Sequence, residues 1–132
     1  MAREAAFAVA ALEQLAIPIT GSHADVLWLS NIKTLSKQRM IAAGLPSPRF
    51  WRLRLDADPA VFARRAPYPC VLKPLSLAAS RGVIRADDPT EFVAAFRRIA
   101  ALLSADGAGQ RYLLAESFLP GPEVALEGLL AD

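Results

Sequence analysis

Lys73 lies between an apolar run, residues 70–72, and a loop of mostly small residues, 75–82. A lysine at a strand end adds a point charge that can neutralise a phosphate group. Small side chains let backbone N–H groups approach anionic oxygens, and the hydroxyls of Ser76 and Ser80 can donate further hydrogen bonds. This pattern suits a polyphosphate ligand. A plain hairpin loop with a lysine extended into solvent explains the same residues equally well.

Two glutamates flank a turn further along the chain. Glu116 follows the apolar run 113–115, and Glu123 follows the Pro-Gly-Pro turn at 120–122. An extended segment between them presents free backbone N–H and C=O groups, which match the polar edge of an adenine. The carboxylates can accept hydrogen bonds from the exocyclic amine of the base and from ribose hydroxyls. Alternatively, both are solvated acids at strand ends, the commoner position of a glutamate.

The composition indicates a folded chain and excludes several classes of protein. With 132 residues, 54% of them apolar, the chain forms one modest domain or part of a larger one. A net charge of +2 gives little support for nucleic acid or an anionic membrane surface as a partner. One cysteine, Cys70, and one histidine, His23, exclude a disulfide framework and a Cys/His zinc site. The longest apolar run, residues 5–12, is far short of the about 20 residues that span a membrane. We therefore expect a cytoplasmic protein.

The first third of the chain is predicted to be helical. Residues 2–16 have apolar positions at helical spacing, and residues 24–43 continue with helical character. Gly44 is a plausible C-terminal cap. Pro46 and Pro48 then form a stiff, extended connector, which we predict to be a domain boundary.

The rest of the chain alternates between strands and helices. Asp58 and Asp88 are predicted to cap helices that each begin with a proline. The predicted strands cover 49–55, 68–74, 82–86 and 111–115, and the predicted helices cover 58–65 and 88–103. This β-α-β-β-α-β order predicts an α+β fold with two helices on one face of a mostly antiparallel sheet. A last strand is predicted over 123–130.

Four motifs in this order resemble the ATP-grasp superfamily, in particular its carboxylate–amine ligase and biotin-carboxylase-like branches. They are Lys37 with Arg39 ahead of an Ala-Gly-Leu-Pro-x-Pro connector, a Val-Leu-Lys-Pro strand end, a small-residue loop that closes with Ser-Arg-Gly-Val, and a Glu-x-x-Leu-x-Gly-x-Glu hinge. Each motif alone is weak. Their order and spacing are more specific, and the resemblance covers nearly the whole chain.

The resemblance implies a role for each matching residue. Lys37 and Lys73 would contact the phosphates of ATP, and residues 76–82 would form a mobile flap over the β- and γ-phosphates. Glu116 would face the adenine amine. The remaining implied nucleotide contacts are the flap residues Ser76, Ser80, Arg81 and Gly82, the backbone of Phe118 and Leu119 at the ring edge, and Glu123 at the ribose. Arg81 is equally well explained as a solvated side chain.

The chain departs from the family pattern in three ways. Ala78 and Ala79 stand where the flap usually has glycines, and Ser36 precedes Lys37 where an aspartate is frequent. The carboxylates and the asparagine that bind Mg²⁺ in the family are expected beyond residue 132. We therefore expect a fragment in three parts: a helical remnant of a preceding domain with its connector (1–48), a lid subdomain (49–115), and an adenine hinge with the first strand of a further subdomain (116–132).

The implied function is the ATP-binding portion of an ATP-dependent ligase, which activates a carboxylate as an acylphosphate for attack by an amine or another nucleophile. ATP and Mg²⁺ are the implied cofactors, a small carboxylate would be bound by other regions, and the parent protein could form a homo-oligomer. By itself the chain is expected to bind nucleotide weakly and to have no turnover. Two alternatives are a non-catalytic nucleotide-binding or interaction module and a ferredoxin-like domain unrelated to ATP. RNA-binding domains with the ferredoxin-like fold have exposed aromatic residues on the face of the sheet. Here Phe92 and Phe96 are predicted to lie on a helix, which argues against that alternative.

Overall fold

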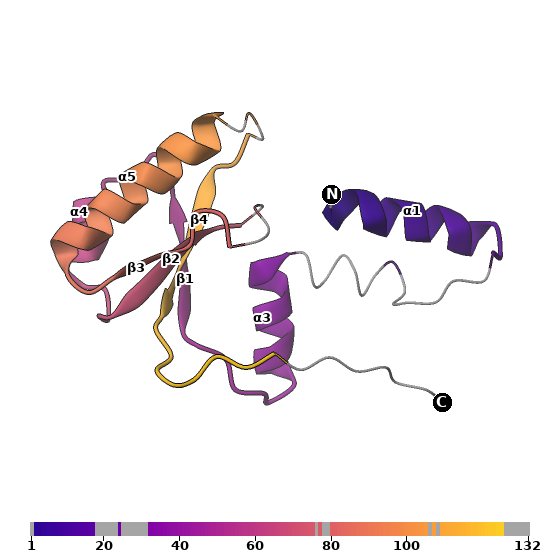
Figure 1. Ribbon diagram of the computed structural model, residues 1–132, viewed down its shortest axis with the longest axis horizontal. Helices are drawn as coiled ribbons and strands as arrows, with labels where there is room; N and C mark the ends of the chain where they lie inside the picture. The colour runs from indigo at the N-terminus through magenta and orange to yellow at the C-terminus, as the bar shows by residue number, and fades with distance from the viewer. Residues whose placement is uncertain are drawn as a thin grey trace.

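The computed structural model describes residues 2–17, 24, 32–75, 77, 80–105, 107 and 109–125. Figure 1 shows a four-stranded sheet with helices on both of its sides. The elements are α1 (Ala2–Gln14), α3 (Lys33–Ala42), β1 (Phe50–Arg54), α4 (Pro59–Ala63), β2 (Cys70–Pro74), β3 (Ile84–Ala86), α5 (Pro89–Ala105) and β4 (Tyr112–Ser117). From β1 to β4 this is the predicted β-α-β-β-α-β order.

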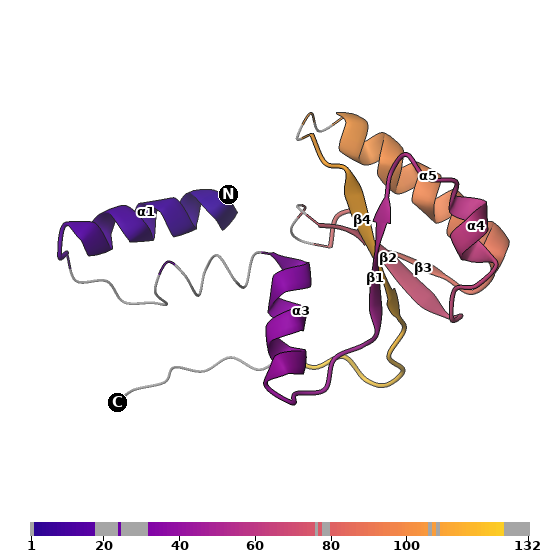
Figure 2. The same cartoon turned by 180° about the vertical axis from the view of Figure 1, so that it is seen from behind.

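The strand order is β1-β4-β2-β3, and every neighbouring pair is antiparallel. Helices α4 and α5 pack together on one face of the sheet, whereas α3 lies on the other side in both views (Figures 1 and 2). The predicted α+β architecture is therefore confirmed. None of the described helices is long and apolar enough to cross a membrane.

The core lies between α5 and the sheet. The apolar face of α5 is buried, and it packs with residues of β2, β3 and β4; its large buried residues are Phe92, Phe96, Ile99 and Leu103. Both predicted caps are present. Asp58 accepts a hydrogen bond from the N–H of Ala60 at 2.9 Å, and Asp88 accepts one from the N–H of Glu91 at 2.9 Å.

Alternation along the strands separates two sets of side chains. In β2, Cys70, Leu72 and Pro74 are buried toward α5, so Val71 and Lys73 point to the opposite side. We call that opposite side the α3 side of the sheet. The strand register adds the following residues to it: Phe50, Arg52, Arg85, Leu114 and Glu116.

The boundaries of several elements differ from the predicted ones. β3 starts at Ile84 because Gly82 and Val83 lie in a turn, in which the N–H of Val83 donates to the carbonyl of Ser80 at 3.2 Å. β4 extends to Ser117 because that residue still pairs with β2. The strand predicted over 123–130 is absent from 123–125, and its remainder lies outside the described residues.

Helix α3 confirms the end of the second predicted helix. Gly44 has a φ of +71°, its N–H donates to the carbonyl of Ile41, and the N–H of Leu45 donates to that of Met40. These bonds form a Schellman cap, in which glycine adopts the left-handed conformation at low cost. Of the predicted range 24–43, residues 25–31 lie outside the described part of the chain.

Candidate functional site

All three lysines of the chain lie in one cluster on the α3 side of the sheet. Lys37 of α3 and Lys73 of β2 form ion pairs with the two carboxylate oxygens of Glu116 in β4, Lys73 with Oε1 and Lys37 with Oε2. Glu116 is only 4% exposed. Residues far apart in the sequence, from α3, β2 and β4, therefore converge on one buried carboxylate.

Strand geometry brings Lys73 and Glu116 together. Glu116 is opposite Val71 in the β2–β4 ladder, and Lys73 is opposite Leu114. The two charged side chains are diagonal neighbours on the same side of the sheet, a separation that a lysine side chain spans. Val71 lies beside the pair and adds an apolar surface.

Lys33 lies one turn before Lys37 on α3 and binds the chain that follows β2. Its Nζ donates to the carbonyl of Leu75 at 3.1 Å and to that of Leu77 at 2.9 Å. Sequence reasoning missed Lys33. The signal that could have found it is its four-residue spacing from Lys37, which places both ammonium groups on one face of a helix.

The cluster has more positive than negative charge, since it contains three ammonium groups and one carboxylate, and two of the ammonium groups contact that carboxylate. Burial lowers the pKa of Lys33 and that of Lys37. The pKa of Lys73 falls to about 8, because of burial first and then the charges of Lys37 and Lys33. An anion placed among these groups would relieve that repulsion, so the cluster is suited to bind one.

Each carboxylate oxygen of Glu116 lies against a lysine ammonium group, Oε1 against Lys73 and Oε2 against Lys37. A carboxylate oxygen has two acceptor positions, so the ion pair with Lys37 leaves Oε2 one position for a further donor. A ligand that donates a hydrogen bond can use this position.

The segment after β4 is only partly free to bind a ligand through its backbone. The N–H of Ser117 donates to the carbonyl of Arg49 at 2.9 Å, and the N–H of Phe118 donates to that of Pro69 at 3.1 Å. Leu119 is 64% exposed, and its N–H has no hydrogen-bond partner among the described residues. The Phe118 N–H is therefore already used, whereas the Leu119 N–H is open to a ligand as far as the described residues go.

The other predicted nucleotide contacts do not join the lysine cluster. Ser80, Arg81 and Glu123 are exposed, and none of them contacts a lysine in the described structure. Ser76 lies outside the described residues. Among the described residues, the site therefore combines Lys37, Lys73 and Glu116 of the predicted set and adds Lys33.

Packing explains the glycine at position 82. Gly82 has a φ of +73°, and a Cβ there would lie 2.9 Å from Cγ of Pro74 and 3.0 Å from Cδ2 of Leu102. Gly82 therefore brings the end of the loop onto β2 and α5, on the side of the sheet away from the lysines. Ser80, two residues earlier, also has a positive φ, of 56°.

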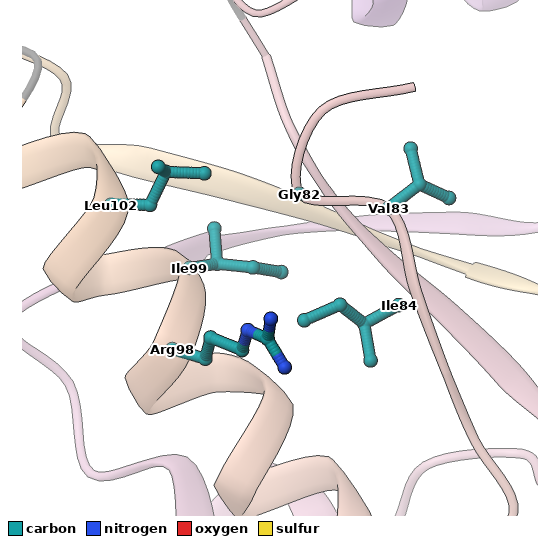
Figure 3. Close-up of a pocket in the computed structure, with 6 residues that line it drawn as sticks. All are labelled: Gly82, Val83, Ile84, Arg98, Ile99 and Leu102. Atoms are coloured by element: carbon teal, nitrogen blue, oxygen red, sulfur yellow. The ribbon is translucent and has the colours of Figure 1, made fainter.

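A pocket of about 510 Å³ lies between β3 and α5 (Figure 3). Residues of α5 reach toward the turn before β3, and the lining consists of Gly82, Val83, Ile84, Arg98, Ile99 and Leu102. Its walls are mostly apolar, with one guanidinium. None of the lysines contributes to it, so it is separate from the charged cluster.

The described residues do not provide a ligand set for the Mg²⁺ that the resemblance implies. No group of three or more His, Cys, Asp or Glu side chains in this part of the chain could hold a metal ion. Mg²⁺ prefers oxygen ligands in near-octahedral order. Glu116, the buried carboxylate, already has a lysine against each oxygen.

Comparison with known sequences gives a consistent result. The ATP-grasp domain family matches residues 66–132. A D-alanine–D-alanine ligase of Ralstonia pickettii is 33% identical over 113 residues, which are 86% of this chain and 32% of that enzyme. The chain thus spans about a third of the length of the curated relatives that it matches.

Solved structures have the same fold. An L-amino acid ligase from Bacillus licheniformis superposes with a TM-score of 0.69 and 28% identity, over 92% of this chain and 28% of that one. The biotin carboxylase domain of the 2-oxoglutarate carboxylase from Hydrogenobacter thermophilus, solved with MgADP, gives a TM-score of 0.70 at 24% identity, over 89% of this chain and 26% of that one. The family match argues against a ferredoxin-like domain unrelated to ATP. The chain belongs to the ATP-grasp family.

Proposed function

We propose that this chain supplies the phosphate- and adenine-binding part of an ATP-dependent ligase, which activates a carboxylate as an acylphosphate for attack by an amine or another nucleophile. The observation that carries the proposal is the convergence of Lys37 and Lys73 on Glu116. Lys33 is the third cation of the same cluster.

The phosphate end of the site consists of the three ammonium groups. Their charge exceeds that of Glu116, and Lys73 is half-buried, so an anion there would be poorly screened by water. Each hydrogen bond from an ammonium group to a phosphate oxygen contributes about 1.5–3 kcal/mol. Such groups stabilise the negative charge that is redistributed during phosphoryl transfer.

The adenine end of the site would lie at Glu116 and Leu119. Oε2 of Glu116 has a second acceptor position besides its ion pair with Lys37, and the exocyclic amine of adenine is a donor that can use it. The N–H of Leu119 can donate to a ring nitrogen. Val71, next to Glu116 in the register, adds an apolar surface. Guanine has a carbonyl at the corresponding position, so it would be disfavoured.

The reaction itself needs no nucleophile from this chain. A carboxylate oxygen of the substrate attacks the γ-phosphorus, the bond to the β-phosphate oxygen breaks, and ADP leaves. The amine then attacks the carbonyl carbon of the acylphosphate, inorganic phosphate leaves, and the amine loses a proton. The related sequences and structures are named D-alanine–D-alanine ligase and L-amino acid ligase, which makes an amino acid the favoured class of carboxylate substrate.

Calorimetric titration of the whole 132-residue chain with ATP, GTP and tripolyphosphate tests the proposal. We expect ATP and tripolyphosphate to bind and GTP to bind more weakly than ATP. Lys73→Ala should lower the affinity for ATP at least about tenfold, equivalent to about 1.4 kcal/mol. Arg52→Ala removes a cation from the same side of the sheet outside the cluster, and it should leave the affinity for ATP unchanged.

Two results would contradict the proposal. One is an ATP affinity that does not depend on Lys73. The other is ATP-dependent ADP release by this chain alone with a pool of carboxylic acids, because the chain is proposed to supply only part of the machinery. Binding of tripolyphosphate without any preference for ATP over GTP would limit the site to phosphate.

A further inference from the structure

We propose that Arg85 is a positioning residue for base recognition, and that it acts by holding Phe118 next to the free backbone donor of Leu119. This inference rests on the proposed function. It assigns a role to a residue of β3 that lies outside the lysine cluster.

The guanidinium of Arg85 lies over the ring of Phe118, 4.3 Å from the ring centroid. This is a close cation–π contact. Because the N–H of Phe118 donates to the carbonyl of Pro69 at 3.1 Å, the residue is held through both its backbone and its ring. The next residue, Leu119, has the free N–H.

Arg85 is itself held in place from α5. Its Nε donates to Oδ1 of Asp87 at 2.6 Å, and the N–H of Asp87 donates to Oε2 of Glu91 at 2.8 Å. Glu91 lies in the first turn of α5 and is bound there by the Asp88 cap. The position of the Phe118 ring is therefore tied to the N-terminus of α5.

The contact also connects β3 to the residue that follows β4, a strand that is not a neighbour of β3. Arg85 is opposite Val71 in the β2–β3 pair, and Val71 is opposite Glu116 in the β2–β4 pair. Arg85, Val71 and Glu116 therefore form one row across three strands, and Phe118 follows shortly after Glu116. Arg85 thus connects the strand after the loop to the segment proposed to read the base.

The chain provides a matched control for this contact. The guanidinium of Arg52 lies over the ring of Tyr112, 4.4 Å from its centroid, on the same side of the sheet. Tyr112 is at the opposite end of β4 from Phe118. Removing either arginine deletes one charge and one cation–π contact, but only Arg85 contacts the segment beside Leu119.

The test measures the dissociation constants of the whole chain for ATP and for tripolyphosphate. The same constants are measured for three variants, Arg85→Gln, Arg85→Lys and Arg52→Gln, after thermal unfolding has shown that each variant is folded. Arg85→Gln should weaken ATP binding about two- to fivefold and leave tripolyphosphate binding unchanged, because only ATP has a base. Arg85→Lys should restore most of the ATP affinity, since it returns a cation to the ring. Arg52→Gln should change neither constant.

Several outcomes would overturn the inference while leaving the proposed function intact. They are an unchanged ATP affinity in Arg85→Gln, an equal loss of affinity for both ligands, and an equal effect of Arg52→Gln. If Arg85→Gln does not fold, Phe118→Leu replaces it, with the same expected loss confined to ATP. Failure of the wild-type chain to bind ATP overturns the proposed function, and the inference with it.

Discussion

Lys73 and Glu116 form an ion pair across the β2–β4 ladder, although they are not opposite each other in the register. Glu116 is opposite Val71, and Lys73 is opposite Leu114. The diagonal arrangement lets the two charged groups meet, and Val71 lies beside the ion pair on the same side of the sheet. This stretch of sheet therefore offers an apolar surface next to a buried ion pair.

Replacing Glu116 by Gln should destabilise the fold. The substitution keeps the shape of the side chain but leaves two largely buried ammonium groups without their counter-charge. We expect a loss of about 1–3 kcal/mol in the free energy of unfolding, measured by urea denaturation. Asp56→Asn, which breaks the exposed pair with Arg54, is the control and should change the free energy of unfolding much less, because water screens that pair. Equal effects would show that the buried pairs contribute no more than a surface one.

The affinity for ATP should fall as the pH rises through 8. The pKa of Lys73 is lowered to about 8 by burial, Lys37 and Lys33, so the side chain loses its proton above that pH. Phosphate favours the ammonium form, so binding above pH 8 must take up a proton. Calorimetry at pH 7 and 9 in buffers of different ionisation enthalpy would measure this uptake.

Lys73→Arg is the control, because a guanidinium remains charged throughout this range. The ATP affinity of this variant should not fall as the pH rises through 8.

The lowered pKa of Lys73 also affects the stability of the fold, with a defined sign. Between about pH 8 and the usual pKa of 10.5, the Lys73 side chain holds fewer protons in the folded state than in the unfolded state. The free energy of unfolding should therefore gain a positive contribution from Lys73 as the pH rises through that window. If the free energy of unfolding instead decreases in this pH range, and Lys73→Arg abolishes the decrease, the lowered pKa of Lys73 is contradicted.

Gly82→Ala should be more damaging than Gly44→Ala. Both glycines have a positive φ, +73° and +71°, but only a Cβ at Gly82 would collide with Pro74 and Leu102. We expect about 1 kcal/mol of destabilisation at Gly44 from backbone strain alone, and about 2–4 kcal/mol at Gly82, where overpacking adds to it. Chemical denaturation of the two variants separates these causes. Equal losses would mean that the neighbours of Gly82 move aside without cost.

Lys33→Met should loosen the chain that follows β2. The substitution removes the donor to the carbonyls of Leu75 and Leu77, and Arg81 further along is an exposed trypsin site. We expect cleavage after Arg81 to become about five- to tenfold faster under native conditions, because cleavage follows the population of the open form. Arg39→Met, an exposed position on the same helix, should leave that rate unchanged. An unaffected rate in Lys33→Met would show that these hydrogen bonds do not restrain the loop.

Local signals were sufficient to predict most of the fold. Asp58 and Asp88 each precede a proline, and both cap helices as expected. Phe92 and Phe96 lie on a helix as predicted, and both are buried. These features depend on residues within one or two turns of each other, so the sequence contains all the information that they need.

The site depends on contacts that no local pattern contains. Lys33 binds the carbonyls of Leu75 and Leu77, and any residue could supply those acceptors, so no side-chain motif marks them. The Arg85–Phe118 contact bridges two strands whose order becomes known only when the sheet is assembled. Lys73 and Glu116 each stand out in a local pattern, but only the family pattern links them to one site.

The order of the strands has a consequence for protein synthesis. β4 lies between β1 and β2, yet it is the last of the four strands along the chain. Until residues 112–117 leave the ribosomal exit tunnel, β1 lacks the strand with which it pairs and Glu116 is not yet available to Lys37 and Lys73. We therefore expect a nascent chain that is stalled before Tyr112 to be cleaved readily by protease and to unfold at low force. Resistance to both should appear abruptly once Ser117 has emerged from the exit tunnel.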